Sequence, residues 1–235
     1  MKKKKYAALT VVGRNPKDQT FQYLQEIKGL DVVRRDWCIL ARAVGERVIG
    51  EILNGQNCDT VIENINQILK ETGEKVKNGS YLLEQFEISK QLQRNPEDYG
   101  DANHQAHVIV ALRNNKNVNN SKKYKTGNVI SYVICENGTT DSSTQRAYSQ
   151  SELLKSPDTL KLDTNYYLTN QIHPVITRLC EPIAGIDAFH VAQALGLDPT
   201  GFKNRSKNTN TLSIAPPQLS KQQKKMESYM NDVEK

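Results

Sequence analysis

Two long segments with apolar residues at helical spacing, joined by a short connection, constrain the fold more than any other feature. The first runs from Arg34 to Asn54 and is followed by Gly55; its apolar positions are Trp37, Leu40, Ala41, Val44, Val48 and Ile52. The second starts at an Asp59 cap and ends at Gly73, with Ile62, Ile65 and Leu69 on one face. Apolar residues three or four positions apart form one helix face, and a short loop favours antiparallel neighbours. We therefore predict a pair of antiparallel helices.

The segments around this pair predict a mixed architecture. Residues 5–12 and 20–27 alternate on either side of a Gly-Pro turn cluster, which is typical of an antiparallel hairpin. Short strands are expected at 86–90 and 129–135, and helices at 104–113 and 185–195, with another that Asp163 caps and Pro174 kinks. Low-complexity residues 114–126 are expected to be a disordered loop, and polar residues 203–235 a tail or linker. The order of these elements predicts an α+β fold that is mainly helical.

The charge of the chain is concentrated at one end. Residues 1–35 hold nine Lys or Arg and three Asp or Glu, which accounts for the whole net charge of +6. Lysines and arginines that neutralise phosphates release counterions, so a basic surface of this kind favours binding to a polyanion. The sequence therefore indicates a docking surface for nucleic acid near the N-terminus.

Two motifs in this basic end, and further runs after it, carry a family resemblance. Lys3, Lys4 and Tyr6 form a Lys-Lys-x-Tyr pattern, and residues 28–36 read Lys-Gly-Leu-x-x-Val-Arg-Arg-Asp. The later runs, in order, are residues 85–90, 95–99, 107–108, 131–135, 145–148, 166–168, 171–174, 180–183, 185–188 and 195–199. Together these runs resemble the B-family replicative DNA polymerases over residues 2–202, and within that family the alpha-type catalytic subunits.

The resemblance implies an organisation and a function. Residues 1–30 are expected to be the hairpin at the end of a palm domain, and residues 31–202 a helical thumb domain with small β-strands. The expected task is binding of primer-template, either DNA or an RNA–DNA hybrid, in a nuclear DNA-directed DNA polymerase that initiates and extends primers with Mg²⁺. Expected partners are the rest of the polymerase chain (palm and fingers) and, through regions that this chain lacks, primase and an accessory subunit.

The same resemblance selects candidate nucleic-acid-binding residues, each of which has a plainer reading. The lysine run is otherwise a solvated tail, and the paired arginines are otherwise surface ion pairs, with Asp31 or Asp36 as partners. We considered that one arginine binds DNA while the other braces the fold through Asp36. The glycine is otherwise a turn residue and the histidine a structural one. The candidates are Lys3, Lys4, Tyr6, Lys28, Gly29, Arg34, Arg35, Lys90 and His107.

Other classes of site find little support in the sequence. There is no Asp-x-Asp pair, so no catalytic or metal-binding residues are assigned, and no cofactor is expected in this chain itself. The four cysteines are isolated, and the His104-x-x-His107 pair has no further ligands at suitable spacing. No run approaches the roughly 20 apolar residues of a membrane span, so no membrane partner is expected. The alternatives are a non-catalytic nuclear helical adaptor with a basic arm, or a small complete enzyme.

The sequence predicts that the chain by itself is catalytically silent. Phosphoryl transfer by two metal ions requires clustered carboxylates, which this sequence does not provide. The purified chain should add no nucleotide to a primed template in Mg²⁺ or Mn²⁺. Primer extension above a blank without enzyme, retained through a second purification, would contradict this.

Overall fold

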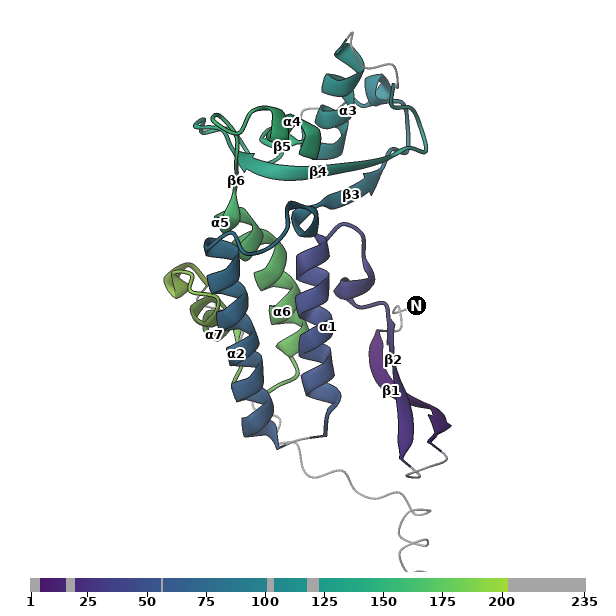
Figure 1. Ribbon diagram of the computed structural model, residues 1–235, viewed down its shortest axis with the longest axis vertical. Helices are drawn as coiled ribbons and strands as arrows, with labels where there is room; N and C mark the ends of the chain where they lie inside the picture. Colours follow the sequence, from purple (N-terminus) through teal and green to yellow (C-terminus); the bar gives the residue numbers. More distant parts are fainter. Residues whose placement is uncertain (1–4, 16–19, 56, 101–103, 118–122, 203–235) are drawn as a thin grey trace, which may run out of the picture. The chain divides into compact units, whose positions relative to one another are not determined.

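The computed structural model describes residues 5–15, 20–55, 57–100, 104–117 and 123–202. These residues form an α+β structure that is mainly helical, which confirms the fold class predicted from the sequence. Figure 1 shows a hairpin, a group of long helices and a small sheet with its own helices. Lys3, Lys4 and the predicted tail at 203–235 lie outside the described residues.

The hairpin consists of β1 (Tyr6–Arg14) and β2 (Phe21–Lys28), paired antiparallel with Tyr6 opposite Lys28. A bulge interrupts the register between Val11 and Gly13. Side chains alternate between the two faces of a strand. Ala7 and Ile27 are cross-strand partners and pack against the hydrophobic core, so Tyr6 and Lys28 belong to the opposite face.

The helical lobe contains α1 (Ile39–Leu53) and α2 (Cys58–Lys77), which pack against each other as the predicted antiparallel pair. Helix α1 begins five positions later than the sequence pattern indicated. Cys38 is the extended N-cap, and its thiol accepts a hydrogen bond from the Ala41 N–H at 3.4 Å. Cys38 is buried, although the first residue of α1, Ile39, is exposed.

Gly73 does not end α2, contrary to the sequence prediction. The helix continues to Lys77, and the left-handed residue beyond it is Gly79, with a φ of 67°. A Cβ atom at Gly73 would lie 2.4 Å from the carbonyl oxygen of Leu195, at the end of α7 (Ala188–Ala194). Glycine at this position thus permits a close approach between the two helices.

The helix that precedes α7 in the lobe is continuous but changes its winding. It comprises α5 (Thr164–Tyr166), a π-helical segment (Tyr167–Ile172) and α6 (His173–Cys180). Proline inside an α-helix removes a hydrogen bond and clashes with the carbonyl of the preceding turn. The π-helical segment ends two residues before Pro174, near where the sequence predicted a kink, so the wider turn accommodates the proline.

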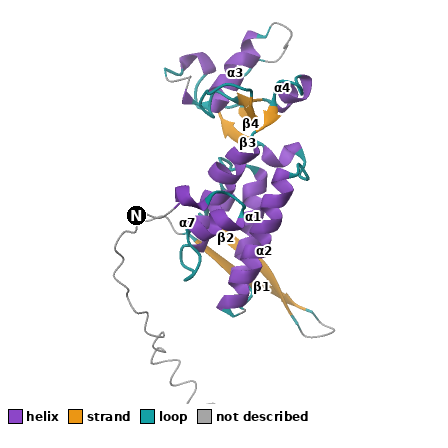
Figure 2. Cartoon of the chain, turned by 90° about the vertical axis from the view of Figure 1, so that its left-hand side faces the viewer, coloured by secondary structure: helices purple, strands orange, loops and turns teal. Residues whose placement is uncertain are grey.

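The sheet lobe contains β3 (Ile88–Gln91), β4 (Val129–Glu136), β5 (Ala147–Tyr148) and β6 (Lys161–Leu162), all antiparallel to β4 at its centre. Two helices, α3 (Ala106–Lys116) and α4 (Gln150–Lys155), pack beside β4. Figure 2 shows this lobe from a second direction. None of the helices that the structure describes is long and apolar enough to cross a membrane.

The loop predicted for residues 114–126 is shorter in the structure. Residues 114–116 continue α3, and Tyr124 is tied to Asn115, whose side chain accepts from the Tyr124 N–H at 2.7 Å and donates to the Tyr124 carbonyl at 2.9 Å. The amide side chain here supplies the hydrogen bonds that low-complexity composition gave no reason to expect. Residues 118–122 lie outside the described residues.

The contact between α2 and α7 can be tested with two glycines in long helices. Gly73→Ala should lower the free energy of unfolding by about 1–3 kcal/mol, because the new methyl group meets the Leu195 carbonyl. Gly50→Ala in α1 should raise it by up to about 1 kcal/mol, since the nearest atom would lie 3.9 Å away and alanine favours the helix. Urea denaturation of both variants measures the difference. Equal effects of the same sign would show that Gly73 is not a packing residue.

Candidate nucleic-acid interface

The two neighbouring arginines of the predicted site lie in a tight turn before α1. The Trp37 N–H donates to the Arg34 carbonyl at 3.4 Å, which places Arg35 and Asp36 at the two central positions of the turn. All three of Arg34, Arg35 and Asp36 are exposed. The sequence had placed the arginines inside a helix start, and the turn instead presents them on the surface.

The structure separates the roles of these two arginines. Arg34 forms an ion pair with Asp36 at 2.5 Å and lies 3.9 Å from Asp31. Asp31 is buried and also pairs with Arg178 of α6 at 2.5 Å. Arg34 therefore braces the turn against the helical lobe. Arg35 makes no ion pair among the residues described, so its guanidinium is available to a ligand.

A surface hollow of about 460 Å³ brings together candidates that are distant in the sequence. Arg35 reaches it from the turn, Lys90 from β3 and His107 from α3. The sequence predicted each of these residues separately, and the fold assembles them at one place. The other lining residues are Asp36, Ser89, Gln91, Gln93, Tyr99, Gln105 and Val129.

The polar lining of this hollow contains residues that the sequence analysis did not select. Tyr99 is the best placed of them, because its hydroxyl accepts from the N–H groups of Gln93 at 2.8 Å and Arg94 at 3.3 Å. These bonds hold the loop after β3 against the hollow. The signal was present in the 95–99 run of the family resemblance, but nothing in the local pattern distinguished Tyr99 from its neighbours.

His107 forms an inner, uncharged part of the hollow. Its side chain is buried and lies edge-on to Tyr99, with ring centroids 6.1 Å apart. Burial, with a smaller contribution from the positive charge of Lys90, lowers the pKa of His107 to about 4. At neutral pH it can offer a hydrogen bond but no charge, so Arg35 and Lys90 supply the positive charge of the hollow.

The remaining described candidates lie together at the open end of the hairpin. Lys28 forms an ion pair with Glu26, and its ammonium lies 5.7 Å from the centre of the Tyr6 ring. Hydrogen bonding to Lys28 lowers the pKa of Glu26, and hydrogen bonding to Glu26 raises the pKa of Lys28. Gly29 follows with a φ of 72°, a conformation that favours glycine because it lacks a Cβ atom. Gly29 thus turns the chain directly after Lys28.

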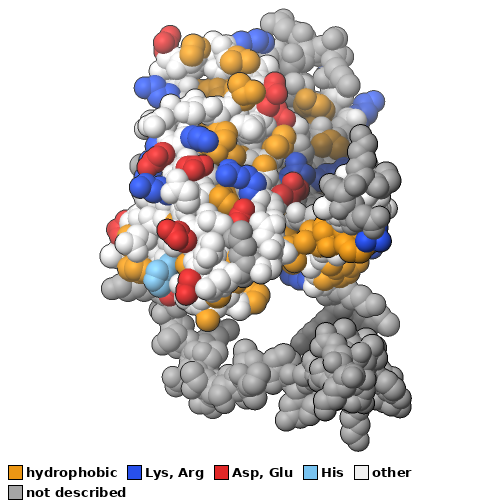
Figure 3. Space-filling view, turned by 60° about the horizontal axis from the view of Figure 1, so that its bottom comes forward, with side chains coloured by type: hydrophobic (Ala, Val, Ile, Leu, Met, Phe, Trp, Pro, Cys, Tyr) orange, Lys and Arg blue, Asp and Glu red, His pale blue; other side chains and the backbone are white. Residues whose placement is uncertain are grey.

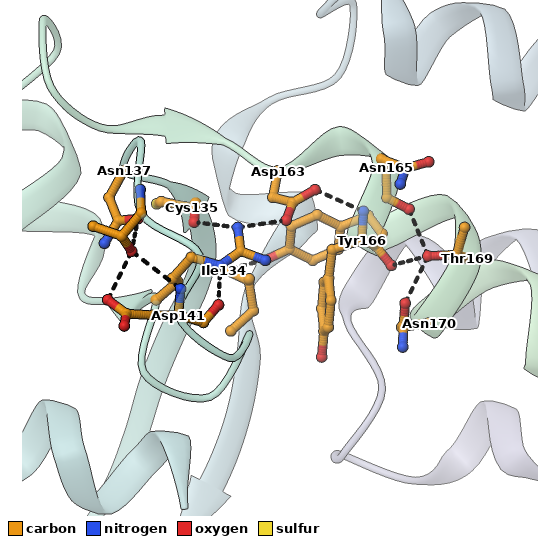
Figure 4. Close-up of polar contacts among 12 residues, drawn as sticks. Ile134, Cys135, Asn137, Asp141, Asp163, Asn165, Tyr166, Thr169 and Asn170 are labelled. Atoms are coloured by element: carbon orange, nitrogen blue, oxygen red, sulfur yellow. Dashed lines mark hydrogen bonds and ion pairs between the residues drawn. The ribbon is translucent and has the colours of Figure 1, made fainter. Parts of the chain in front are cut away.

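A polar network fixes the sheet lobe to the helix that carries the π-helical segment. Arg146 donates to Asp163 at 2.8 Å and to the Cys135 carbonyl at 3.0 Å, and Asp163 also accepts from the Tyr166 N–H at 2.8 Å (Figure 4). Asp163 is buried, and a buried charge needs partners. The Arg146 guanidinium and the Tyr166 N–H supply them. The network holds β4 at the start of the helix.

A second hollow, of about 690 Å³, lies between α2 and α7 and contains no predicted site residue. Its charged lining is mixed, with Glu63, Glu74, Lys70 and Lys77. Among the described residues, no three His, Cys, Asp or Glu side chains form a cluster that could hold a metal ion.

Comparison with known proteins places these features in a family. The model of DNA polymerase family B matches residues 1–183. The catalytic subunits of DNA polymerase alpha from Mus musculus and Xenopus laevis are 48% and 46% identical over 95% of the chain. The chain spans about 15% of the length of these curated relatives. A family B DNA polymerase from Pyrobaculum calidifontis superposes with a TM-score of 0.56 at 25% identity, over 70% of this chain and 20% of that one.

The buried position of His107 predicts a dependence of stability on pH. An unfolded chain binds a proton at this residue near pH 6.5, whereas the folded chain does so only near pH 4. Stability should therefore fall as the pH drops below 6.5 and level off below 4, with a loss from this residue of about 2 kcal/mol between pH 7 and pH 5.

The variant His107→Phe isolates this effect, because it keeps an aromatic ring but cannot titrate. Urea denaturation of both proteins at pH 7 and pH 5 should show the smaller loss in the variant. The two share every other titrating group, including His173, whose pKa burial also lowers. Equal losses would mean that His107 is not buried as described.

Proposed function

The chain belongs to DNA polymerase family B, and from this premise we propose that its described residues form a grip on the primer-template duplex. The hollow lined by Arg35, Lys90 and His107 receives a stretch of phosphate backbone. The basic end of the hairpin, with Tyr6 and Lys28, makes a second contact with the same duplex. Lys3 and Lys4 extend that contact.

The observation that carries the proposal is the meeting of Arg35 and Lys90 at one hollow. Both side chains are exposed, and neither makes an ion pair among the residues that the structure describes. Arginine suits phosphate because its planar fork donates two parallel hydrogen bonds, and lysine acts as a compact point charge. The fold places these two residues, which are more than fifty positions apart, around a space that an anion can enter.

The proposed contacts are independent of base sequence. Charged and polar groups aimed at phosphates fix the position of a duplex but do not read its bases. A grip of this kind suits DNA and also an RNA–DNA hybrid, whose A-like form is recognised through shape and backbone.

Membership of the family is the basis for proposing the activity of the whole parent enzyme. We propose that the parent enzyme is a nuclear DNA-directed DNA polymerase that initiates and extends primers in replication, with Mg²⁺ as its metal ion. Among the described residues, no three His, Cys, Asp or Glu side chains form a cluster that could hold such an ion. Proposed partners are the remaining palm and fingers, primase and an accessory subunit.

The exposed apolar side chains of the hairpin are evidence for a contact with other parts of the parent polymerase. Several of its large apolar side chains are exposed: Leu9, Val11, Val12, Phe21, Tyr23 and Leu24. Figure 3 shows apolar side chains gathered at the right of the molecule, where the hairpin lies in Figure 1. A two-stranded hairpin is at best marginally stable alone in water, so an apolar surface of this kind favours cover by further polymerase segments.

Salt titration of duplex binding tests the grip. The chain should bind primer-template with an affinity on the order of 10⁻⁴–10⁻⁶ M, and Lys90→Ala should reduce the slope of log K against log salt by about 0.9, the value of one phosphate contact. Lys70→Ala, an exposed lysine of α2 outside the proposed grip, should leave the slope unchanged. Fluorescence anisotropy on two duplexes of unrelated sequence should give the same result.

Two outcomes would contradict the proposal. If Lys70→Ala reduces the slope as much as Lys90→Ala, the hollow is not the grip, and the alternative of a helical adaptor with a basic arm gains support. Strong preference for one of the two duplexes would show base recognition, which backbone contacts do not provide.

A further inference from the structure

The hairpin end holds an acid where a nucleic-acid contact is proposed. Lys28 and Tyr6 are cross-strand partners, as are Glu26 and Ala8, so Tyr6, Glu26 and Lys28 share one face of the hairpin. This is the face opposite Ala7 and Ile27, which pack against the core. The carboxylate of Glu26 thus lies among the groups that would otherwise be open to a phosphate.

The contacts of Glu26 match those expected of a bound anion. Its carboxylate forms an ion pair with the Lys28 ammonium, and the Lys28 ammonium lies beside the Tyr6 ring. Hydrogen bonds from Lys28 and, to a smaller extent, from Tyr6 lower the pKa of Glu26. A phosphate oxygen would use the same two donors, an ammonium and a phenol hydroxyl.

We propose that Glu26 is an internal stand-in for phosphate, which occupies the Lys28–Tyr6 pair in the free protein and is displaced when a nucleic-acid backbone binds. The inference rests on the proposed function, because it assigns a specific competitor to one of its contacts. Glu26 then weakens binding to any polyanion and limits the hairpin to ligands that also engage the rest of the grip.

The exposure of the pair permits such an exchange. The side chain of Lys28 is 62% exposed and that of Glu26 39% exposed. Exposed ion pairs are weak because water screens them and two side chains must be held in place. Displacement of Glu26 by phosphate therefore requires little free energy, yet the competition lowers the affinity measurably.

The Arg34–Asp36 pair also joins opposite charges two positions apart, but its placement differs. Arg34 is also close to the buried Asp31, which Arg178 holds from α6. That pair belongs to a network that braces the turn, and its opening would disturb the helical lobe. Within the part of the chain that the structure describes, the Glu26–Lys28 pair has no ion pair to the helical lobe, so it is the one that a ligand can open.

A double-mutant cycle on duplex affinity tests the proposal with the full chain. Glu26→Gln keeps the shape of the side chain and removes its charge. At low salt it should tighten binding to a primer-template about two- to fivefold, the size expected for release of an exposed ion pair. The slope of log K against log salt should steepen by up to about 0.9, because Lys28 then neutralises a phosphate without losing a partner.

Repeating Glu26→Gln in a Lys28→Gln protein distinguishes two causes of tighter binding. One is release of Lys28 from Glu26, and the other is weaker repulsion between the Glu26 carboxylate and the duplex. In a Lys28→Gln protein, Glu26→Gln should give less than half of that gain, since no cation remains to be released. Glu63→Gln, an exposed acid of α2, serves as the matched control and should change the affinity by less than Glu26→Gln. Circular dichroism melting checks that each variant is folded.

The outcomes distinguish failure of the stand-in role of Glu26 from failure of the proposed grip on the duplex. If the unmodified chain binds the duplex with the expected salt dependence but Glu26→Gln has no effect, or an effect equal to that of Glu63→Gln, the stand-in role is wrong and the grip remains. A gain that persists fully in the Lys28→Gln background also overturns it. Absence of duplex binding by the unmodified chain would overturn the proposed function itself, together with this inference.

Discussion

The arrangement of the candidate site depends on one buried side chain, that of Tyr167. Its hydroxyl accepts from the Ile134 N–H of β4 at 2.9 Å, and its ring packs on Phe86 with centroids 4.9 Å apart. One helical turn later, the Gln171 side chain accepts from the Cys38 N–H at 2.9 Å, directly before α1. The π-helical segment thus connects the sheet lobe, which carries Lys90 and His107, with the turn that carries Arg35. Without this connection the charged side chains would have no reason to share a hollow.

Electrostatic pairing limits how strongly the site can bind. Arg34 is held by Asp36, and Lys28 by Glu26, so part of the basic charge is already neutralised within the protein. Of the described candidate residues, Arg35 and Lys90 remain for a ligand, because neither has an ion pair among the described residues. A surface of this kind favours weak and salt-sensitive binding, as the proposed grip on a duplex requires.

The sequence predicted the elements better than their contacts. The periodicity around Leu40 and Ile65 was sufficient for the helix pair, because it records which face is buried. It could not show that Gly73 lies inside the helix, because glycine is required there by the close approach of the Leu195 carbonyl, far along the chain. Asp163 was correctly identified as a helix cap, but its pairing with Arg146 depends on how β4 and the helix meet.

The same limit applies to the candidate site. The charge excess and the family motifs selected Arg35, Lys90 and His107, but only the fold shows that they line one hollow. Arg34 and Arg35 look equivalent in sequence, but in the structure Arg34 forms ion pairs with Asp36 and Asp31, and Arg35 forms none among the described residues. Glu26 was overlooked because its effect depends on cross-strand pairing, which sets the neighbours of a strand residue.

The central claim is that Arg35 and Lys90 act together on one stretch of backbone, and a double-mutant cycle tests it most directly. The affinities of the unmodified chain, Arg35→Ala, Lys90→Ala and the double variant for a primer-template should be measured at one low salt concentration. If both side chains engage neighbouring phosphates across one hollow, the two losses should be non-additive, with a coupling of about 0.5–3 kcal/mol. Losses that add without coupling, or a loss in only one variant, would contradict the claim.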